Sequence, residues 1–415
     1  MLLLYKLLIR LYGLGLYLAS FFHPKARKWH QGRKNWRAKH RALKQDKIQT
    51  GQPLIWMHCA SLGEFEQGRP ILEGLKRNQA KVQILLSFYS PSGFEIRKDY
   101  PMADAVVYLP LDTHRNAQQF LHIWQPNVAI FVKYEIWYHF LHQLEKRTIP
   151  TVLIAALFRP EQFFFQWYGR PVLKRLRHLT HIFVQEAASA QLLHRFGFEK
   201  VSIAGDTRID RVLAIAAQKE SLPKLEAFTQ TKAPVFLVGS NWPQDDTILF
   251  PFFRQGLPDN WKIILAPHHV DEHRMGQLEK QILDSRVRYS EENLEAFERA
   301  RVLIIDNIGL LSRLYRYGKI AYIGGGFGSG IHNTLEPMAF GLPIIFGPKH
   351  QKFREAVYLV ASGSGFCVEN MAELKQAFET LQNEEHYQAV SGSIRTYLEQ
   401  NEGASEQILS YIKQL

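Results

Sequence analysis

The chain has 415 residues, more than the ~250–300 at which a single hydrophobic core stops growing, so two domains are expected. Apolar residues make up 46% and charged residues 22% of the sequence, which excludes a largely disordered protein, and the two cysteines exclude a disulfide-rich scaffold. The net charge of +12 comes almost entirely from one end, because residues 1–45 contain eleven Lys and Arg and no Asp or Glu.

This N-terminal segment, residues 1–45, is predicted to associate with a membrane. It starts with an apolar and aromatic stretch that is interrupted by Lys6 and Arg10, and the other cations follow. A cleavable signal peptide places its charges first, and a spanning helix needs about 20 mostly apolar residues. We therefore expect a shallowly inserted anchor on an anionic surface, with a single span or a core helix as alternatives. The apolar stretch argues against a nucleic-acid-binding arm.

Short apolar runs separated by amphipathic stretches occupy residues 46–215. The runs are continuous rather than alternating, as in strands that are buried on both faces of a parallel sheet. They lie at 53–59, 82–90, 105–110, 128–135, 151–157, 181–186 and 201–205. This series predicts an N-terminal Rossmann-like domain.

A second series of apolar runs predicts a second Rossmann-like domain over residues 233–415, whose last helix can pack back on the first domain. Residues 216–232 contain Pro223 and no strand pattern, and we interpret them as a linker. The fold class is therefore α/β, and ligands of such sheets bind beyond the carboxyl ends of the strands. The second series lies at 234–240, 262–268, 302–307, 320–326, 343–348 and 365–370.

Two glutamates follow predicted strands of the first domain. Ser61 and Glu64 match a capping box, in which both side chains bind amides at the start of a helix. Alternatively, Glu64 takes a proton from an acceptor hydroxyl. Glu135 lies near Lys133 and can form a purely structural pair with this lysine. Alternatively, it orients the acceptor or tunes Glu64.

A glycine-rich loop in the second domain predicts a nucleotide site. It is followed by a predicted helix start in which Asn333 or Thr334 is the cap, so that loop amides and the positive helix end form an anion site. Glu336 either caps the helix or takes ribose hydroxyls. The residues predicted to hold the nucleotide here are Gly324, Gly325, Gly326, Asn333, Thr334 and Glu336.

Polar or small residues also follow three other predicted strands. Taken alone, Arg208 can be a surface charge, and His268 or His269 can be a structural histidine. Together we interpret the following residues as further donor contacts: Arg208, Ser240, Pro267, His268 and His269.

The chain has no spacing typical of a zinc site and no Walker-type phosphate loop. These features argue against metal-centred chemistry and ATP hydrolysis, and we expect neither a metal ligand nor a cofactor. Cys59 and Cys367 lie in apolar runs and are interpreted as small buried hydrophobic residues.

In this order, the motifs resemble the Kdo (3-deoxy-D-manno-octulosonic acid) transferases of lipopolysaccharide biosynthesis over nearly the whole chain. The resemblance implies the two-domain GT-B glycosyltransferase fold and inverting transfer of Kdo from CMP-Kdo to a lipid A precursor, lipid IVA. It also implies a position on the cytoplasmic face of the bacterial inner membrane, anchored by residues 1–45. The motifs that carry it lie at 61–64, 90–93, 108–112, 135–137, 205–210 and 332–348.

The resemblance also implies roles for individual residues. Glu64 corresponds to the catalytic base and Glu135 to a second active-site carboxylate. The glycine loop with Asn333 and Glu336 corresponds to the part that holds CMP. The residues assigned to the acceptor side and its surroundings are Ser61, Gly63, Ser90 and Arg159.

Several positions depart from the family pattern. Lys133 stands where an acidic residue is usual, His268 stands where an arginine is usual, and Trp242 stands where a histidine is usual. The departures leave two alternatives open. One is a GT-B enzyme at the membrane surface that uses a UDP- or GDP-sugar, and the other is a membrane-bound sugar-nucleotide binding protein that has lost catalysis.

Overall fold

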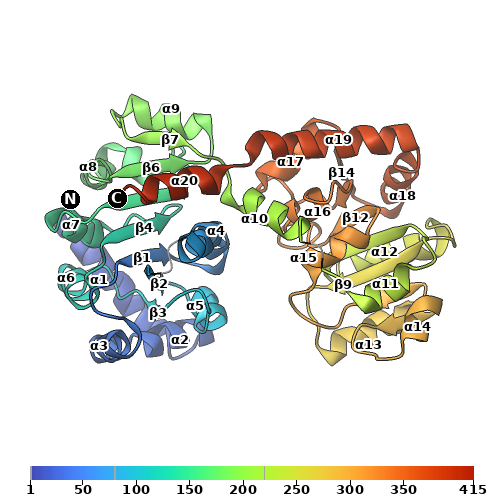
Figure 1. Ribbon diagram of the computed structural model, residues 1–415, viewed down its shortest axis with the longest axis horizontal. Coiled ribbons are helices and arrows are strands. Elements are labelled where there is room, and N and C mark those ends of the chain that lie inside the picture. The colour runs from blue at the N-terminus through green and yellow to red at the C-terminus, as the bar shows by residue number, and fades with distance from the viewer. Residues whose placement is uncertain (1, 79–80, 219) are drawn as a thin grey trace. The chain divides into compact units, whose positions relative to one another are not determined.

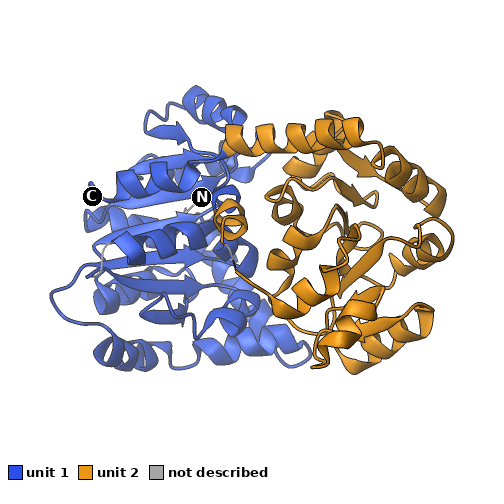
Figure 2. Ribbon diagram, turned by 45° about the vertical axis from the view of Figure 1, so that its right-hand side comes forward, with its two compact units in different colours: residues 1–210, 402–415 blue, residues 211–401 orange. Residues whose placement is uncertain are grey.

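The computed structural model describes residues 2–78, 81–218 and 220–415 and divides the chain into two compact units (Figure 1). Unit 1 consists of Met1–Asp210 and Glu402–Leu415, and unit 2 consists of Arg211–Asn401 (Figure 2). The boundary at Asp210 falls inside helix α10 (Thr207–Ala216). Each unit is an α/β layer structure around one parallel sheet, which confirms the predicted fold class.

The sheet of unit 1 has seven parallel strands in the order β3-β2-β1-β4-β5-β6-β7. Trp56 at its centre is aligned with Leu85 on one side and with Ala129 on the other. All seven predicted runs of this half therefore form strands. Their bounds are β1 (Leu54–Cys59), β2 (Gln83–Phe88), β3 (Ala105–Tyr108), β4 (Val128–Val132), β5 (Thr151–Ala156), β6 (His181–Val184) and β7 (Val201–Ile203).

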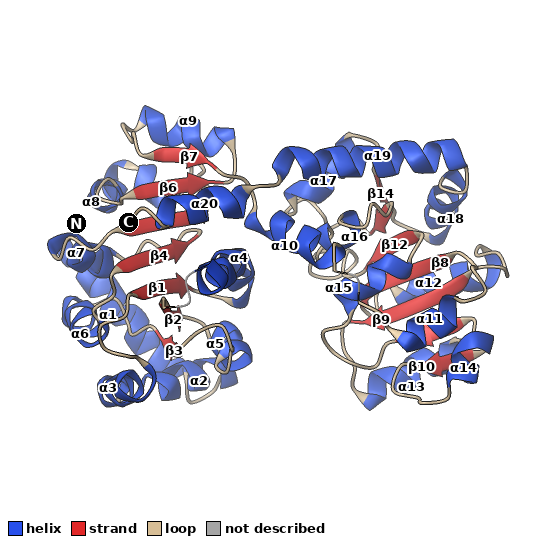
Figure 3. Ribbon diagram, viewed as in Figure 1, coloured by secondary structure: helices blue, strands red, loops and turns tan. Residues whose placement is uncertain are grey.

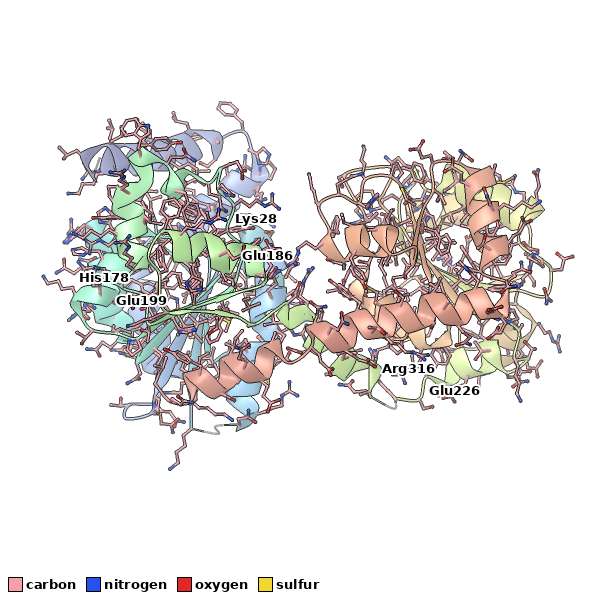
Figure 4. All side chains as sticks on the ribbon, turned by 90° about the horizontal axis from the view of Figure 1, so that it is seen from above. Lys28, His178, Glu186, Glu199, Glu226 and Arg316 are labelled. Atoms are coloured by element: carbon pink, nitrogen blue, oxygen red, sulfur yellow. The ribbon has the colours of Figure 1, made fainter. Side chains whose placement is uncertain are left out.

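Helices cover both faces of this sheet (Figure 3). Because side chains alternate along a strand, Trp56 belongs to the core on one face and Met57 to the core on the other. Charged side chains of this unit such as Lys28 and Glu199 are exposed (Figure 4). The helices of this unit after residue 50 are α4 (Leu62–Asn78), α5 (Pro91–Arg97), α6 (His114–Trp124), α7 (Tyr138–Lys146), α8 (Arg170–Leu176), α9 (Ala187–Arg195) and α20 (Ala404–Ile412), with 3-10 turns at Phe163–Phe165 and Trp167–Gly169.

Unit 2 also has seven parallel strands, in the order β10-β11-β9-β8-β12-β13-β14. Strand β10 was not expected, because its three residues, Arg-Val-Arg, form an edge strand with only one buried side chain. The strands are β8 (Val235–Asn241), β9 (Lys262–Pro267), β10 (Arg286–Arg288), β11 (Val302–Ile304), β12 (Ile320–Ile323), β13 (Ile344–Phe346) and β14 (Gly365–Cys367). The helices are α11 (Pro223–Thr229), α12 (Asp246–Gln255), α13 (Glu272–Gln281), α14 (Leu294–Arg299), α15 (Leu311–Leu314), α16 (Leu335–Met338), α17 (Arg354–Ala361), α18 (Met371–Thr380) and α19 (Glu384–Asn401), with a 3-10 turn at Tyr315–Tyr317.

The boundaries of the units differ from the expected division at residues 215 and 233. The expected linker contains α11, whose Leu225 and Phe228 are fully buried, and this helix packs against α14 within unit 2. At the other end, α20 completes the core of unit 1 with Ile408. The Asp210 carboxylate accepts the amides of Gly403 (2.7 Å) and Ser405 (2.6 Å) at the start of this helix.

The N-terminal segment forms the helices α1 (Leu2–Ala19), α2 (Pro24–Arg33) and α3 (Trp36–Lys47). In the described part of the chain, no helix alone has the length and apolar character required to cross a membrane; α1 and α2, bent by 118°, reach it only as a pair. Helices α2 and α3 contribute to unit 1, because Trp36 lies in its core and the buried Arg33 donates to the carbonyls of Leu109 (2.8 Å) and Tyr89 (2.7 Å).

Helix α1 has one side on unit 1 and one side in solvent. Its inner side is fixed by Tyr5, whose hydroxyl donates to Asp112 at 2.5 Å, and by Tyr12, which stacks on Tyr89. Its outer side exposes a row of leucines: Leu3, Leu4, Leu7, Leu8, Leu11, Leu14 and Leu18.

The substitution Ile408→Ala is expected to destabilise unit 1. It would leave a cavity in a fully buried site, and changes of this type lower the free energy of unfolding by about 2–5 kcal/mol. Thermal and chemical unfolding measure the loss. Ser410→Ala, at an exposed position of the same helix, is the control and should change stability little. Equal effects of the two substitutions would show that α20 is not part of this core.

Candidate functional site

The strand order of unit 1 reverses next to β1, because the chain proceeds from β1 to β2 and β3 and then returns to place β4 on the other side of β1. Open parallel sheets bind ligands beyond the carboxyl ends of their strands at such a switch point. Glu64 follows β1 and Glu135 follows β4, so the two predicted catalytic carboxylates come from the two strands that flank this point.

Glu64 lies in the first turn of α4 and caps this helix. Its Oε2 atom accepts the amide of Ala60, which precedes Ser61, the residue whose amide a capping box would bind. Burial and the charge of Glu135 raise the pKa of Glu64 to about 8, although amide hydrogen bonds from Ala60 and Ser61 and the charge of Lys133 act in the opposite direction. Glu64 is therefore a structural cap, and it is also a carboxyl group whose pKa lies near neutral pH.

Glu135 is held by two side chains that the sequence did not single out as site residues. Its Oε2 atom accepts from the indole nitrogen of Trp137 at 2.6 Å and lies 3.3 Å from Nε2 of His58. The Glu135 side chain is 12% exposed and His58 is fully buried. A histidine inside an otherwise apolar strand was the available signal for this contact.

His58 connects Glu135 to the next strand. Its Nδ1 atom lies 2.9 Å from Oγ and 3.1 Å from the carbonyl oxygen of Ser87. A carbonyl only accepts, which favours a proton on Nδ1 and leaves Nε2 to accept from the Trp137 indole at 3.1 Å. The contact between Nε2 and Glu135 is then favourable only when one of the two atoms carries a proton.

The other residues assigned to the acceptor side lie at the same end of the sheet. Ser90 caps α5, and its amide donates to the carbonyl of Ala60 at 2.7 Å, which joins the turns after β1 and β2. Gly63 is exposed, and a Cβ atom there would meet nothing within 4 Å. Arg159 is exposed after β5. Burial raises the pKa of Tyr134, the charge of Arg159 opposes this shift, and the charges of Glu186 and Glu64 add to it.

Arg208, which was predicted to contact the donor, lies in unit 1 at the start of α10. Its guanidinium forms an ion pair with Asp206, with Nη2 at 2.6 Å from Oδ2. The remaining predicted donor residues lie in unit 2.

In unit 2 the strand order reverses between β8 and β12, and the glycine-rich loop follows β12. The loop packs so closely on neighbouring turns that side chains are excluded. A Cβ atom on Gly324 would lie 2.4 Å from the carbonyl oxygen of Ser240, and one on Gly326 would lie 2.6 Å from Cα of Gly347. Ser240 itself has φ 55° at a bulge between β8 and β9.

The buried carboxylate of Asp245 holds this loop in place. No role was predicted for this residue from the sequence. Its carboxylate accepts the amides of Gly325 (2.9 Å) and Trp242 (2.7 Å) and the hydroxyl of Tyr322 (3.0 Å). The Gly325 amide is thus already bonded within the protein. Burial raises the pKa of Asp245, and these hydrogen bonds lower it.

The helix after the loop starts where it was predicted to start and is short. Helix α16 has four residues, so the helix end offers an anion the amides of one turn rather than the dipole of a long helix. The side chain of Asn333 accepts the amide of Leu335 at 3.1 Å, and Thr334 is fully buried at the cap position. Glu336 is half-buried, and its charge contributes to raising the pKa of the buried Tyr315.

Three aromatic rings form a stack at the carboxyl ends of β8, β9 and β12. Trp242 stacks on His268 with ring centres 4.3 Å apart, His268 stacks on His332 at 4.5 Å, and the Trp242 indole donates to Nε2 of His332 at 2.7 Å. His269 meets Trp242 edge-on at 5.0 Å, directly after Pro267 at the end of β9.

The histidines of this stack are uncharged at neutral pH. Burial and His268 lower the pKa of His332 to about 4, and burial and His269 lower the pKa of His268. The stack therefore offers a flat aromatic surface rather than the cation that an arginine would supply. Among the described residues, no group of three or more His, Cys, Asp or Glu side chains is arranged to hold a metal ion.

Comparison with known proteins identifies relatives over most of the chain. Residues 34–211 match the family model described as 3-deoxy-D-manno-octulosonic-acid transferase. The 3-deoxy-D-manno-octulosonic acid transferase of Aquifex aeolicus is 29% identical over 341 residues, which cover 80% of this chain and 87% of that protein. The protein of the same name from Haemophilus influenzae is 27% identical over 377 residues, 86% of each chain.

Solved structures with the same fold are more distant in sequence. UDP-GlcNAc 2-epimerase from Neisseria meningitidis bound to UDP-GlcNAc has a TM-score of 0.59 and 13% identity, and the match covers 87% of this chain and 100% of that chain. The epimerase from Methanocaldococcus jannaschii has a TM-score of 0.51 and 16% identity and covers 80% and 93%. These similarities support the fold only, two parallel α/β units of the GT-B class.

The substitution Glu64→Gln is expected to stabilise the protein at alkaline pH. The pKa of Glu64 is about 8 in the folded state and roughly 4.3 in an unfolded chain, so the folded state keeps a proton that the unfolded state releases. Stability of the parent protein therefore falls as pH rises between these two values, and glutamine removes this loss. Thermal scans should show that the Tm of the variant minus that of the parent increases from about pH 5 to about pH 8.5.

The control for this experiment is Glu66→Gln on the same helix. Glu66 forms an ion pair with Arg97 at 2.9 Å, so its replacement should not increase stability at high pH. A Tm difference for Glu64→Gln that does not change with pH would contradict the raised pKa.

Proposed function

We propose that this chain, which belongs to the family of 3-deoxy-D-manno-octulosonic acid (Kdo) transferases, transfers Kdo from CMP-Kdo to a hydroxyl of a lipid A precursor with inversion at the anomeric carbon. The observation that carries the proposal is the pair of carboxylates at the β1/β4 switch point, where burial and the charge of Glu135 raise the pKa of Glu64 to about 8. A general base works best when its pKa is close to the working pH.

In the proposed reaction Glu64 takes the proton of the acceptor hydroxyl, and the hydroxyl oxygen attacks the anomeric carbon of Kdo at the same time. The bond between this carbon and the phosphate oxygen of CMP breaks, and CMP leaves with the bonding electrons. Glu135, oriented by Trp137 and His58, keeps the proton affinity of Glu64 high. The reaction needs a base and anion contacts, and we propose no metal or other cofactor.

We further propose that unit 2 binds the donor. The glycine loop after β12 and the turns after β8 and β9 lie at the switch point of its sheet, where parallel sheets bind nucleotides. Support comes from the close packing of Gly324 and Gly326, which leaves backbone rather than side chains at the loop surface. The proposed donor residues of unit 2 are Ser240, Pro267, His268, His269, Gly324, Gly325, Gly326, Asn333, Thr334 and Glu336, and Arg208 is the proposed donor contact from unit 1.

The acceptor is proposed to approach unit 1 from a membrane surface. The exposed leucines of α1 provide an apolar face, and residues 1–45 provide the cations that an anionic leaflet attracts. This arrangement suits the cytoplasmic face of the inner membrane as the working place. The proposed acceptor contacts are Ser61, Gly63, Ser90 and Arg159.

The aromatic stack of Trp242, His268 and His332 supports a second candidate function. This stack is uncharged, whereas the family pattern has an arginine at the position of His268. The difference is compatible with a donor that carries another nucleotide. The second candidate is a GT-B enzyme that uses a UDP- or GDP-sugar.

Glu64→Gln is expected to reduce kcat/KM by about 10²–10⁴-fold, the usual contribution of a general base. The assay combines CMP-Kdo with lipid IVA and identifies the products by mass spectrometry. In the parent protein, kcat/KM should rise with pH through about 8 as Glu64 loses its proton. Glu66→Gln should have activity near that of the parent. Normal turnover by well-folded Glu64→Gln would exclude Glu64 as the base.

Ligand-induced stabilisation tests the donor assignment. A ligand present at 100 times its Kd stabilises the folded state by about 2.7 kcal/mol, and we expect CMP to raise Tm more than UDP or GDP at equal concentration. The reverse order would support the second candidate. Gly326→Ala should abolish the effect, because its Cβ would lie 2.6 Å from the backbone of Gly347. Gly276→Ala, where a Cβ meets nothing within 4 Å, is the control.

A further inference from the structure

A basic cavity lies in unit 1 between α1 and the start of α6. Its volume is about 460 Å³, and it shares no residue with the proposed acceptor, base or donor sites. The residues of its wall that matter here are Lys6, Arg10, Thr113, His114, Arg115 and His139.

The cavity wall carries positive charge without a neutralising partner. No ion pair found in the described part of the chain involves Lys6, Arg10 or Arg115, and no lining residue is acidic. The nearest carboxylate in sequence is Asp112, which is fully buried. It accepts from the Tyr5 hydroxyl (2.5 Å) and from two backbone amides, so its hydrogen-bonding capacity is directed into the protein.

The amino-terminal end of α6 forms another part of the wall. This helix has eleven residues, and Thr113 is its cap, accepting the amide of Asn116 at 3.3 Å. The first turn of a helix presents amides and partial positive charge to an anion. His114 and Arg115 are the first two helical residues and add side chains that can donate to the same anion.

His139 provides independent support for a ligand. This residue is 2% exposed and lines the cavity, and its Nδ1 atom has no hydrogen-bond partner among the described residues. Buried polar atoms are nearly always bonded, and those that are not commonly face a ligand or water. Burial, together with the charges of His114, Lys6 and His142, lowers the pKa of His139 to about 4.

The position of α1 indicates what carries the anion. Lys6 and Arg10 are separated by one helical turn and both line the cavity, whereas Leu4, Leu7 and Leu11 are exposed on the outer side of this helix. An amphiphile could place its charged group against the two cations and its hydrocarbon chains along the leucines. A soluble anion would have no use for the apolar side.

We propose that this cavity binds the phosphomonoester headgroup of a membrane lipid, with Lys6, Arg10 and Arg115 around the phosphate and the first turn of α6 and His139 donating to its oxygens. The proposal does not depend on the transferase reaction. Binding here would hold α1 against unit 1 at a defined headgroup rather than on anionic surfaces in general.

The test is vesicle flotation with the full chain. Phosphatidylcholine vesicles contain either phosphatidic acid, a phosphomonoester, or phosphatidylglycerol, a phosphodiester, in amounts adjusted to equal surface charge. The parent protein should prefer phosphatidic acid. Arg115→Ala should weaken binding to these vesicles by about tenfold through loss of a charge-assisted contact and should bind phosphatidylglycerol vesicles almost as the parent does. Arg115 is exposed, so its replacement should leave Tm unchanged.

Lys28→Ala is the matched control, because it removes the same charge from an exposed position on α2 (Figure 4). This variant should keep the preference for phosphatidic acid. Equal losses in Arg115→Ala and Lys28→Ala on both vesicle types would overturn the proposal in favour of general surface attraction. Inorganic phosphate that raises Tm in the parent but not in Arg115→Ala, without any vesicle preference, would overturn the assignment to a lipid.

Discussion

Two carboxylates are held close together where the strand order of unit 1 reverses, and the chemistry of this unit depends on their mutual repulsion. Parallel strands present their carboxyl ends on one edge, so the turns after β1 and β4 bring Glu64 and Glu135 to the same place. Burial and the neighbouring charge make it unfavourable to ionise both. The Trp137 indole donates a hydrogen bond to Glu135, and His58 contacts the same carboxylate oxygen. These two contacts fix the position of the Glu135 carboxylate.

Unit 2 also has a parallel sheet with a switch point, but different residues lie at this point. Its loop is supported internally by Asp245, which uses the Gly325 amide, and its neighbouring turns carry the uncharged stack of Trp242, His268 and His332. An aromatic surface and backbone groups therefore lie beside this loop, and the Lys349 ammonium donates to the Gly328 carbonyl at 2.6 Å. Of the departures from the family pattern, His268 and Trp242 lie here, where a nucleotide is proposed to bind, and Lys133 lies in unit 1.

The sequence was sufficient to predict the sheets but not the contacts that join distant segments. Continuous apolar runs identified thirteen of the fourteen strands, and β10 was missed because Arg286 and Arg288 flank a single buried residue. The glutamates could be found because they follow strands, whereas His58 and Asp245 gain their roles from residues far away in the chain. The start of α16 was predicted correctly at Asn333 or Thr334, but a cap and a proline do not indicate where a helix ends, so its length of four residues could not be predicted.

The chain leaves unit 1 within α10 and returns to it at Glu402, so unit 2 is inserted into the sequence of unit 1. Ile408 and Ile412 then complete a core whose strand residues come from β1, β2, β4, β5 and β6, all much earlier in the chain. During synthesis, unit 2 can close as soon as its own residues have emerged. Unit 1 is completed only after α20 has been synthesised, and until then the surface that this helix covers stays accessible to chaperones and to other chains.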